Sequence, residues 1–198
     1  MKHFWTLFIT IIVLTAILSG CNRVLDDIDD VTINNKIIQY KDFHVKSEST
    51  ELDTSVRGTV FLYGEEVPEH AQIIALIEID PDDWGGVAFY IPEKWNISNV
   101  TSSYPEEKNE EKPENYIAIW NTESERYELT TMIEIGTGRN YIPTGGGKGA
   151  IIIDLDINKA TDISTSDIFN IIVEVGSEEK DGIRSIRPDY EFIEISAP

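Results

Sequence analysis

The sequence predicts an all-β fold, an antiparallel β-sandwich of about nine to eleven strands, with a closed barrel as the alternative. Short stretches alternate between apolar and polar residues with a period of two, as in Ile73 to Ile79. Glycine, proline, asparagine and aspartate separate these stretches, as in Asp80 to Gly86. No stretch shows the 3.6-residue apolar period of an amphipathic helix.

The first element is a leader over residues 1–20. Lys2 precedes an uncharged run from Phe4 to Leu18, and small residues follow. This order is typical of a secretory signal peptide, and the run is shorter than the ~18 residues expected of a membrane-spanning helix.

The ending Leu18-Ser19-Gly20-Cys21 resembles the lipobox of bacterial lipoproteins. The resemblance implies cleavage before Cys21, a diacylglyceryl (palmitate-type) lipid on its thiol, and a place on the outer, extracytoplasmic face of a cell membrane. An uncleaved anchor helix is the alternative.

Residues 21–35 are interpreted as an acidic tether, and residues 36–198 as a single β-sandwich domain. The tether holds Asp26-Asp27-Ile28-Asp29-Asp30 and few large apolar side chains, so it has little to bury. Cys21 is the only cysteine. The domain therefore depends on its core rather than on disulfide bonds.

The charge of the chain limits the classes of molecule that it is expected to bind. The formal net charge of −20 becomes −21 without the leader, which holds Lys2 and no acidic residue. A field of this sign argues against nucleic acid and anionic lipid headgroups as ligands. We expect the membrane as a partner through the lipid anchor, together with an envelope protein or glycan.

Strands are expected wherever β-branched and aromatic residues cluster or alternate. In chain order these segments are Ile37–Val45, Val56–Tyr63, Ala71–Asp80, Val87–Ile91, Tyr116–Trp120, Leu129–Ile135, Ile151–Ile157, Ile168–Val175, Ile183–Ile186 and Tyr190–Ile195. Asp181-Gly182 is expected to form a hairpin turn between two strands. Residues 104–115 are rich in glutamate and proline and are expected to form a solvated loop, and residues 145–149 a glycine-rich turn.

This series of short strands is similar to immunoglobulin-like and cohesin-like modules of bacterial surface proteins. The resemblance implies a sandwich architecture, and no functional residue is carried over from it.

No residue stands out as catalytic or as a metal ligand. The chain lacks His-Glu-x-x-His and Gly-x-Ser-x-Gly motifs. Calcium could bind the turn with Asp80, Asp82 and Asp83, or Asp154 and Asp156 on one strand face, but neither group matches the twelve-residue calcium loop. We expect no cofactor besides the covalent lipid at Cys21.

Trp84, with Asp82 and Asp83, is the candidate binding site. It precedes Gly85-Gly86, where a turn can expose a large ring, and an exposed tryptophan beside acids suits sugar binding. The alternative is that Trp84 belongs to the core, where Trp95 and Trp120 are expected.

The predicted function is a non-enzymatic binding or interaction module of the cell envelope; the alternative is a surface carbohydrate-active or other hydrolytic enzyme.

Overall fold

The computed structural model describes residues 36–106, 112–121, 129–136, 145–158, 168–176, 178–180, 183–185 and 188–196. The chain divides into Met1–Asn35 and a second compact unit, Lys36–Pro198, and the description below concerns the second. The leader, the tether and Cys21 lie outside the described residues.

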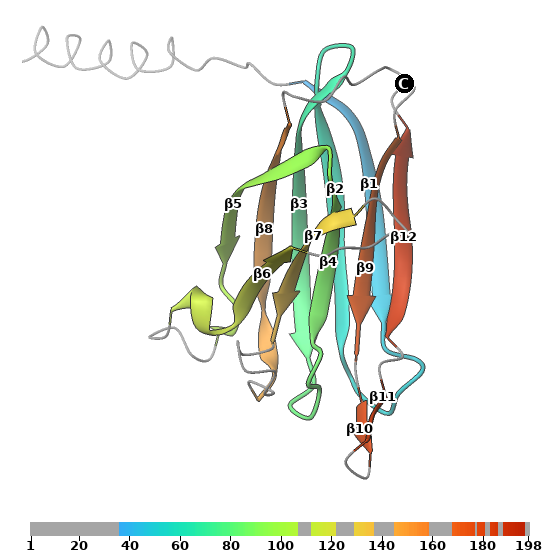
Figure 1. Ribbon diagram of the computed structural model, residues 1–198, viewed down its shortest axis with the longest axis vertical. Coiled ribbons are helices and arrows are strands. Elements are labelled where there is room, and N and C mark those ends of the chain that lie inside the picture. Colours follow the sequence, from blue (N-terminus) through green and yellow to red (C-terminus); the bar gives the residue numbers. More distant parts are fainter. Residues whose placement is uncertain are drawn as a thin grey trace, which may run out of the picture. The chain divides into compact units, whose positions relative to one another are not determined.

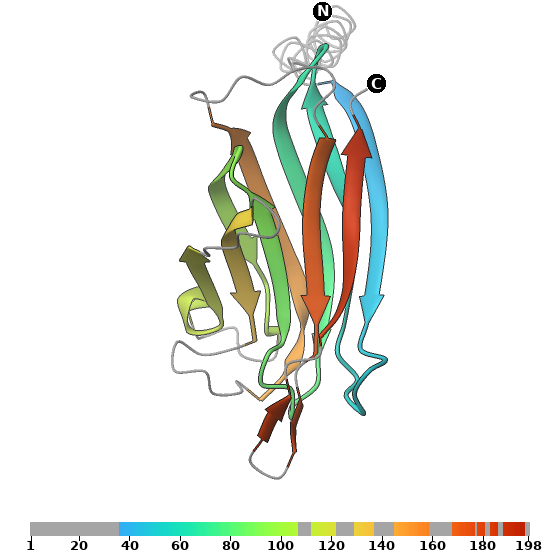
Figure 2. The same cartoon turned by 45° about the vertical axis from the view of Figure 1, so that its right-hand side comes forward.

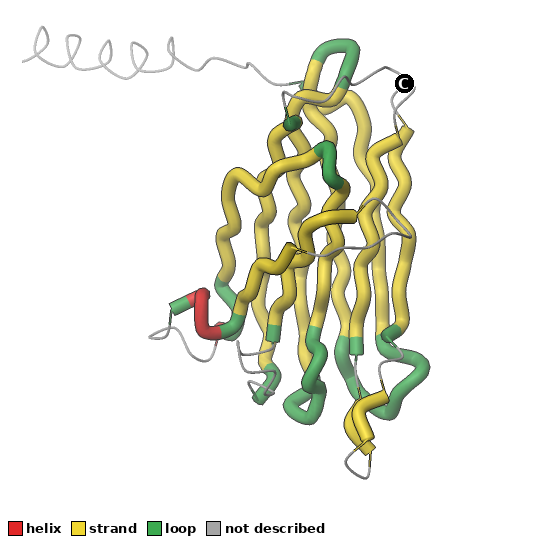
Figure 3. The backbone as a smooth tube through the Cα atoms, viewed as in Figure 1, coloured by secondary structure: helices red, strands yellow, loops and turns green. Residues whose placement is uncertain are grey.

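Twelve strands and one 3₁₀ turn are present in the described part of the chain (Figures 1 and 3). The elements are β1 (Ile37–Lys46), β2 (Ser55–Gly64), β3 (Pro68–Ile79), β4 (Val87–Pro92), β5 (Trp95–Ser102), η2 (Pro113–Asn115), β6 (Ile117–Asn121), β7 (Leu129–Ile135), β8 (Gly147–Ile157), β9 (Ile168–Val175), β10 (Glu178–Lys180), β11 (Ile183–Ser185) and β12 (Asp189–Ser196).

Ten of these strands form two five-stranded antiparallel sheets. Sheet 1 has the order β1-β2-β3-β8-β5, and sheet 2 has the order β12-β9-β4-β7-β6. The prediction of an antiparallel β-sandwich is confirmed. β10 and β11 pair separately, on either side of Asp181-Gly182, a dipeptide outside the described residues.

The core lies between the sheets and follows the alternation of the strands. On β3 the buried positions are every second residue from Ala71 to Ile79, while the residues between them point away from the core. Strands of both sheets contribute side chains with no exposed surface, among them Leu62 and Ile153 from sheet 1 and Phe89 and Ile133 from sheet 2. Burial of this apolar area stabilises the fold by roughly 25 cal/mol per Å².

The two sheets approach each other where β1 lies beside β12 (Figure 2). Lys41 Nζ on β1 donates to the backbone oxygen of Glu194 on β12 at 3.5 Å. Asp189, at the start of β12, accepts hydrogen bonds from the backbone N–H groups of Glu48 and Ser49 at 2.6 and 2.7 Å, and from the Ser49 hydroxyl at 2.6 Å. These contacts join β1 and the segment after it to sheet 2.

Strand β5 is absent from the sequence prediction, because its apolar pattern changes parity. Trp95 and Ile97 share one parity, but Val100 has the other. The register of β5 against β8 shifts between Ile97 and Asn99, and this bulge returns Val100 to the core side, where it packs against the core.

The expectation of a turn over residues 145–149 is wrong for its second half, since β8 begins at Gly147. Gly149 faces Tyr104 closely: a Cβ on this glycine would lie 2.5 Å from the Tyr104 Cα. The glycine is needed for close approach rather than for a turn.

The loop expected over residues 104–115 is anchored at its start by a core side chain. Tyr104 is 3% exposed and packs edge-on against Tyr116, with ring centroids 6.2 Å apart. Glu106 and the residues from Lys112 to Asn115 are exposed, as expected, and residues 107–111 lie outside the described part.

Candidate functional site

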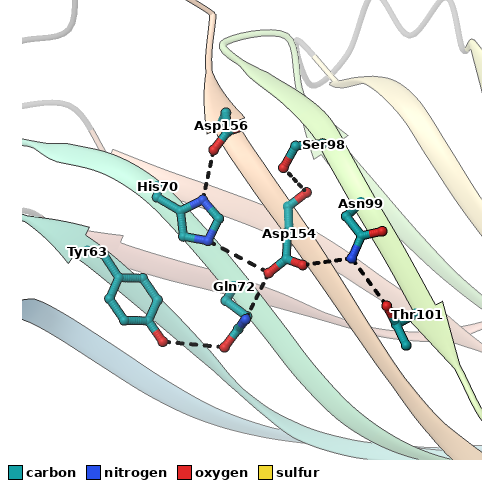
Figure 4. Close-up of polar contacts among 8 residues, drawn as sticks. All are labelled: Tyr63, His70, Gln72, Ser98, Asn99, Thr101, Asp154 and Asp156. Atoms are coloured by element: carbon teal, nitrogen blue, oxygen red, sulfur yellow. Dashed lines mark hydrogen bonds and ion pairs between the residues drawn. The ribbon is translucent and has the colours of Figure 1, made fainter. Parts of the chain in front are cut away.

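The outer face of sheet 1, which points away from sheet 2, carries a network of polar side chains near the start of β3 and the end of β8. Figure 4 shows its members. We call it the Asp154 cluster; its members are Tyr63, His70, Gln72, Ser98, Asn99, Thr101, Asp154 and Asp156. The strand register produces it, because His70 pairs with Asp156, and Gln72 and Asn99 both pair with Asp154. Residues directly opposite each other share one face of a sheet, so β3, β8 and β5 each add side chains to the same patch.

Asp154 is the centre of this network. Its Oδ1 accepts a hydrogen bond from Gln72 Nε2 at 2.8 Å, and its Oδ2 accepts one from Asn99 Nδ2 at 3.1 Å. His70 Nε2 lies 3.7 Å from the same Oδ1. The side chain of Asp154 is 21% exposed, so several donors hold a carboxylate that is largely withdrawn from water.

His70 stands between two carboxylates. Its Nδ1 is 2.8 Å from Asp156 Oδ1, and the Asp156 side chain is 59% exposed. The Tyr63 hydroxyl donates to Gln72 Oε1 at 3.3 Å and thereby joins the network. Burial, and then the negative charge of Asp154, raise the pKa of Tyr63, so its phenol remains a neutral donor at physiological pH.

Aromatic rings continue from this cluster across β2 to β1. We call Tyr40, Phe61 and Tyr63 the aromatic row. Neighbouring centroids in the row are 6.4 Å apart, and the Tyr63 ring lies 5.5 Å from the His70 ring. The successive rings are tilted by 32° and 37°, not perpendicular. Tyr40 is exposed and Phe61 and Tyr63 are partly exposed, so the row adds accessible aromatic surface to this face.

Aliphatic side chains occupy the same face next to the aromatic row. Ile74 is 38% exposed and Leu76 is 51% exposed, and Tyr40 of the neighbouring aromatic row is 65% exposed. Lys148 and Glu78 form an ion pair beside Leu76. Apolar residues rimmed by polar and charged groups are typical of a surface that another molecule covers.

Asp83, one of the sequence candidates, is fully buried and shapes the loop between β3 and β4. Its Oδ1 accepts the N–H groups of Gly85 and Gly86, each at 2.9 Å, and its Oδ2 accepts the Thr54 hydroxyl at 2.5 Å. Asp82 is exposed, and its N–H donates to Asp80 Oδ1 at 2.9 Å. The structure thus shows Asp83 as a support of the loop rather than as an exposed contact residue.

The expectation that Trp84 exposes its ring is wrong. The residue is only 9% exposed, and it lines a cavity beside β4 on the outer face of sheet 2. Trp95 is a core residue, as expected, and packs edge-on against Phe169 with centroids 5.0 Å apart. Trp120 is not part of the core: it is half-buried on the outer face of sheet 2, where its Nε1 donates to Glu134 Oε2 at 2.9 Å.

Among the described residues, no group of three or more His, Cys, Asp or Glu side chains is arranged to hold a metal ion. Within the same residues, no helix is both long and apolar enough to cross a membrane. Lipid attachment at Cys21 stays a prediction, because that residue lies outside the described part of the chain.

Sequence reasoning placed Asp154 and Asp156 on one strand face but missed the cluster around them. His70 and Gln72 lie more than 80 residues away in the chain, and only the pairing of β3 with β8 brings them to the carboxylates. The available signal was the alternation of β3, which sends His70 and Gln72 to the side opposite Ala71 and Ile73.

No protein-family model matches this chain, and no curated protein matches it. A solved structure described as "pH-induced modulation of Streptococcus parasanguinis adhesion by Fap1 fimbriae" is similar over 80% of this chain and 96% of that chain. The two are 10% identical, with a TM-score of 0.33. At that score the similarity carries no argument about function.

Proposed function

We propose that this chain is a non-enzymatic binding module, anchored by a lipid at Cys21 to the outer face of a bacterial cell membrane. Through the outer face of sheet 1 it binds an envelope protein or polymer. The proposal rests on one observation: the Asp154 cluster, the aromatic row and the exposed Ile74 and Leu76 all lie on the same face of sheet 1.

The chemistry of this face suits binding. Amide, imidazole and carboxylate groups that hold one another in place lose little conformational freedom when a ligand arrives. The aromatic row and Leu76 add apolar area that gains stability when a partner excludes water from it. The lipid anchor rests on the resemblance of Leu18-Ser19-Gly20-Cys21 to a lipobox.

The proposal is tested by co-sedimentation of the purified chain, carrying Cys21→Ser to prevent lipidation, with isolated bacterial cell envelopes. Tyr40→Ser and Leu76→Ser are expected to weaken binding about tenfold each, since exposed anchors of this kind carry much of an interface's energy. Tyr190→Ser is the matched control, because Tyr190 is 57% exposed on the outer face of sheet 2. Equal binding by all variants would remove the outer face of sheet 1 as the binding surface.

A further inference from the structure

A cavity of about 190 Å³ opens on the other sheet, at one end of its outer face. We call it the Glu174 pocket. Its walls come from β4, β7, β9 and the loop before β4, and its main side chains are Trp84, Tyr90, Met132, Glu134, Glu174 and Pro188. None of these residues belongs to the binding surface proposed on sheet 1.

The strand register explains why a hollow forms here. Ala88 on β4 pairs with Glu134 on β7 and with Glu174 on β9, so a small side chain lies between two long acidic ones. Adjacent strands are ~4.8 Å apart, which separates the two glutamate backbones by about 10 Å. Gly85 and Gly86 line the cavity and place no side chain in it.

An aromatic donor orients each carboxylate. The Tyr90 hydroxyl donates to Glu174 Oε2 at 2.9 Å, and Trp120 Nε1 donates to Glu134 Oε2 at 2.9 Å. One oxygen of each glutamate is thus tied to the wall of the pocket. Side chains fixed in this way form a site before any ligand arrives.

The pocket is electronegative and partly withdrawn from water. In the part of the chain that the structure describes, none of its lining side chains is a lysine, arginine or histidine. Burial raises the pKa of Glu174, although the hydrogen bond from Tyr90 acts in the opposite direction. A carboxylate with this desolvation cost is stabilised by a cation that reaches it.

We propose that the Glu174 pocket binds an organic ammonium group, either a primary amine or a methylated one. Trp84 and Tyr90 line the pocket with aromatic side chains, the class of side chain that attracts organic cations, and Glu174 supplies the opposite charge. At ~30 Å³ per water molecule, the cavity has room for about six non-hydrogen atoms, which is the size of one ammonium head group with a short stem. The apolar lining by Met132, Ala88 and Val175 suits the methyl or methylene groups of such a ligand better than a bare metal ion.

The test is titration of the purified mature chain, with Cys21→Ser, by choline chloride at low ionic strength, followed by tryptophan fluorescence and by NMR chemical shifts. The comparison ligand is 3,3-dimethyl-1-butanol, which has nearly the shape of choline but no charge. Choline is expected to bind at least tenfold more tightly than this alcohol. Its affinity is expected to fall as the pH is lowered through the pKa of Glu174, because the neutral acid no longer attracts a cation.

Glu174→Gln keeps the size of the side chain and removes its charge, and it is expected to weaken choline binding at least tenfold. Tyr90→Phe, which frees Glu174 from its donor, is expected to weaken binding about threefold. Glu194→Gln is the matched control: it makes the same charge change at an exposed position on β12, and it should leave the affinity unchanged. Equal binding of choline and the neutral alcohol, absence of choline binding, or equal effects of the Glu174 and Glu194 variants would each overturn the proposal.

Discussion

Trp84 is largely buried next to a turn that Asp83 fixes. The residue is 9% exposed, and Asp83 accepts the N–H groups of Gly85 and Gly86 in the loop between β3 and β4. Trp84→Ala is therefore expected to lower the free energy of unfolding by about 3–5 kcal/mol, as for a large aromatic removed from a packed site. Urea denaturation measures this loss. A midpoint close to that of the unmodified chain would mean that the ring contributes no packing.

The lowered pKa of Asp189 predicts that the stability of the fold depends on pH. Burial alone would raise its pKa, but hydrogen bonds from the Ser49 hydroxyl and from the N–H groups of Ser49 and Glu48 outweigh that effect and hold the pKa below its usual range. A depressed folded-state pKa stabilises the fold above the unfolded pKa, near 3.9, and the contribution disappears as the pH falls through the folded value.

The unmodified chain should therefore exceed the Asp189→Asn variant in stability at pH 7, and the difference should shrink as the pH is lowered through about 4 and below. Denaturation curves of both chains across this range check the sign. A difference that grows on acidification would contradict the assigned hydrogen bonds.

At the scale of single residues, sequence reasoning located polar side chains but not their partners. The alternation of β3 and β8 put Gln72 and Asp154 on a sheet face, yet the hydrogen bond between them depends on a pairing of strands far apart in the chain. For Trp84 the glycine-rich turn suggested exposure, whereas the residue is 9% exposed. The hydrogen bonds from Gly85 and Gly86 to Asp83 that fix this turn leave no periodic signal in the sequence.

At the scale of elements, the loop from Glu106 to Pro113 offers a direct test of which residues hold the fold. Both of these residues are exposed, whereas the flanking Tyr104 and Tyr116 are buried against each other. Replacing Glu106 to Pro113 with a short Gly-Ser linker is expected to change the free energy of unfolding by less than about 1 kcal/mol, because the two tyrosines remain. Chemical denaturation of the loop variant makes the measurement, and a loss of several kcal/mol would show that the loop itself supports the core.

Strand prediction succeeded where the alternation of apolar and polar residues was unbroken. It failed where a bulge or a close backbone contact interrupted that alternation. The expected strands from Ile168 to Val175 and from Leu129 to Ile135 have the bounds found in the structure. β5 was missed because a bulge reverses the parity of its apolar residues, and the start of β8 was missed because Gly149 serves close packing against Tyr104. A bulge and a backbone approach are tertiary features, and a local pattern does not contain them.

At the scale of the whole molecule, the lipobox predicts where the chain is held. Cys21→Ala is expected to leave the protein unprocessed or to release it from membranes, since two acyl chains are needed for stable attachment and the variant would carry none. Membrane fractionation and mass spectrometry of the mature N-terminus check this outcome. An unmodified thiol at Cys21 in the membrane-bound protein would contradict lipid anchoring.

The sandwich divides its polar chemistry between two opposite faces. Sheet 1 presents a broad surface with the Asp154 cluster at one end and exposed apolar side chains beside it, whereas sheet 2 contains a small acidic and aromatic pocket. A broad surface suits a macromolecule and a small pocket suits one chemical group. The two proposed binding sites are therefore independent of each other, and a result that contradicts one leaves the other unaffected.

The most direct measurement of the central claim is hydroxyl-radical footprinting of the chain, with and without an excess of isolated cell envelopes. Tyr40 and Leu76 on sheet 1 are 65% and 51% exposed, and Tyr190 and Phe192 on sheet 2 are 57% and 40% exposed, so the two faces serve as probe and internal control in one experiment. If the outer face of sheet 1 is the binding surface, envelopes will reduce oxidation of Tyr40 and Leu76 several-fold and leave Tyr190 and Phe192 unchanged. Protection of Tyr190 and Phe192 alone, or of no residue, would contradict it.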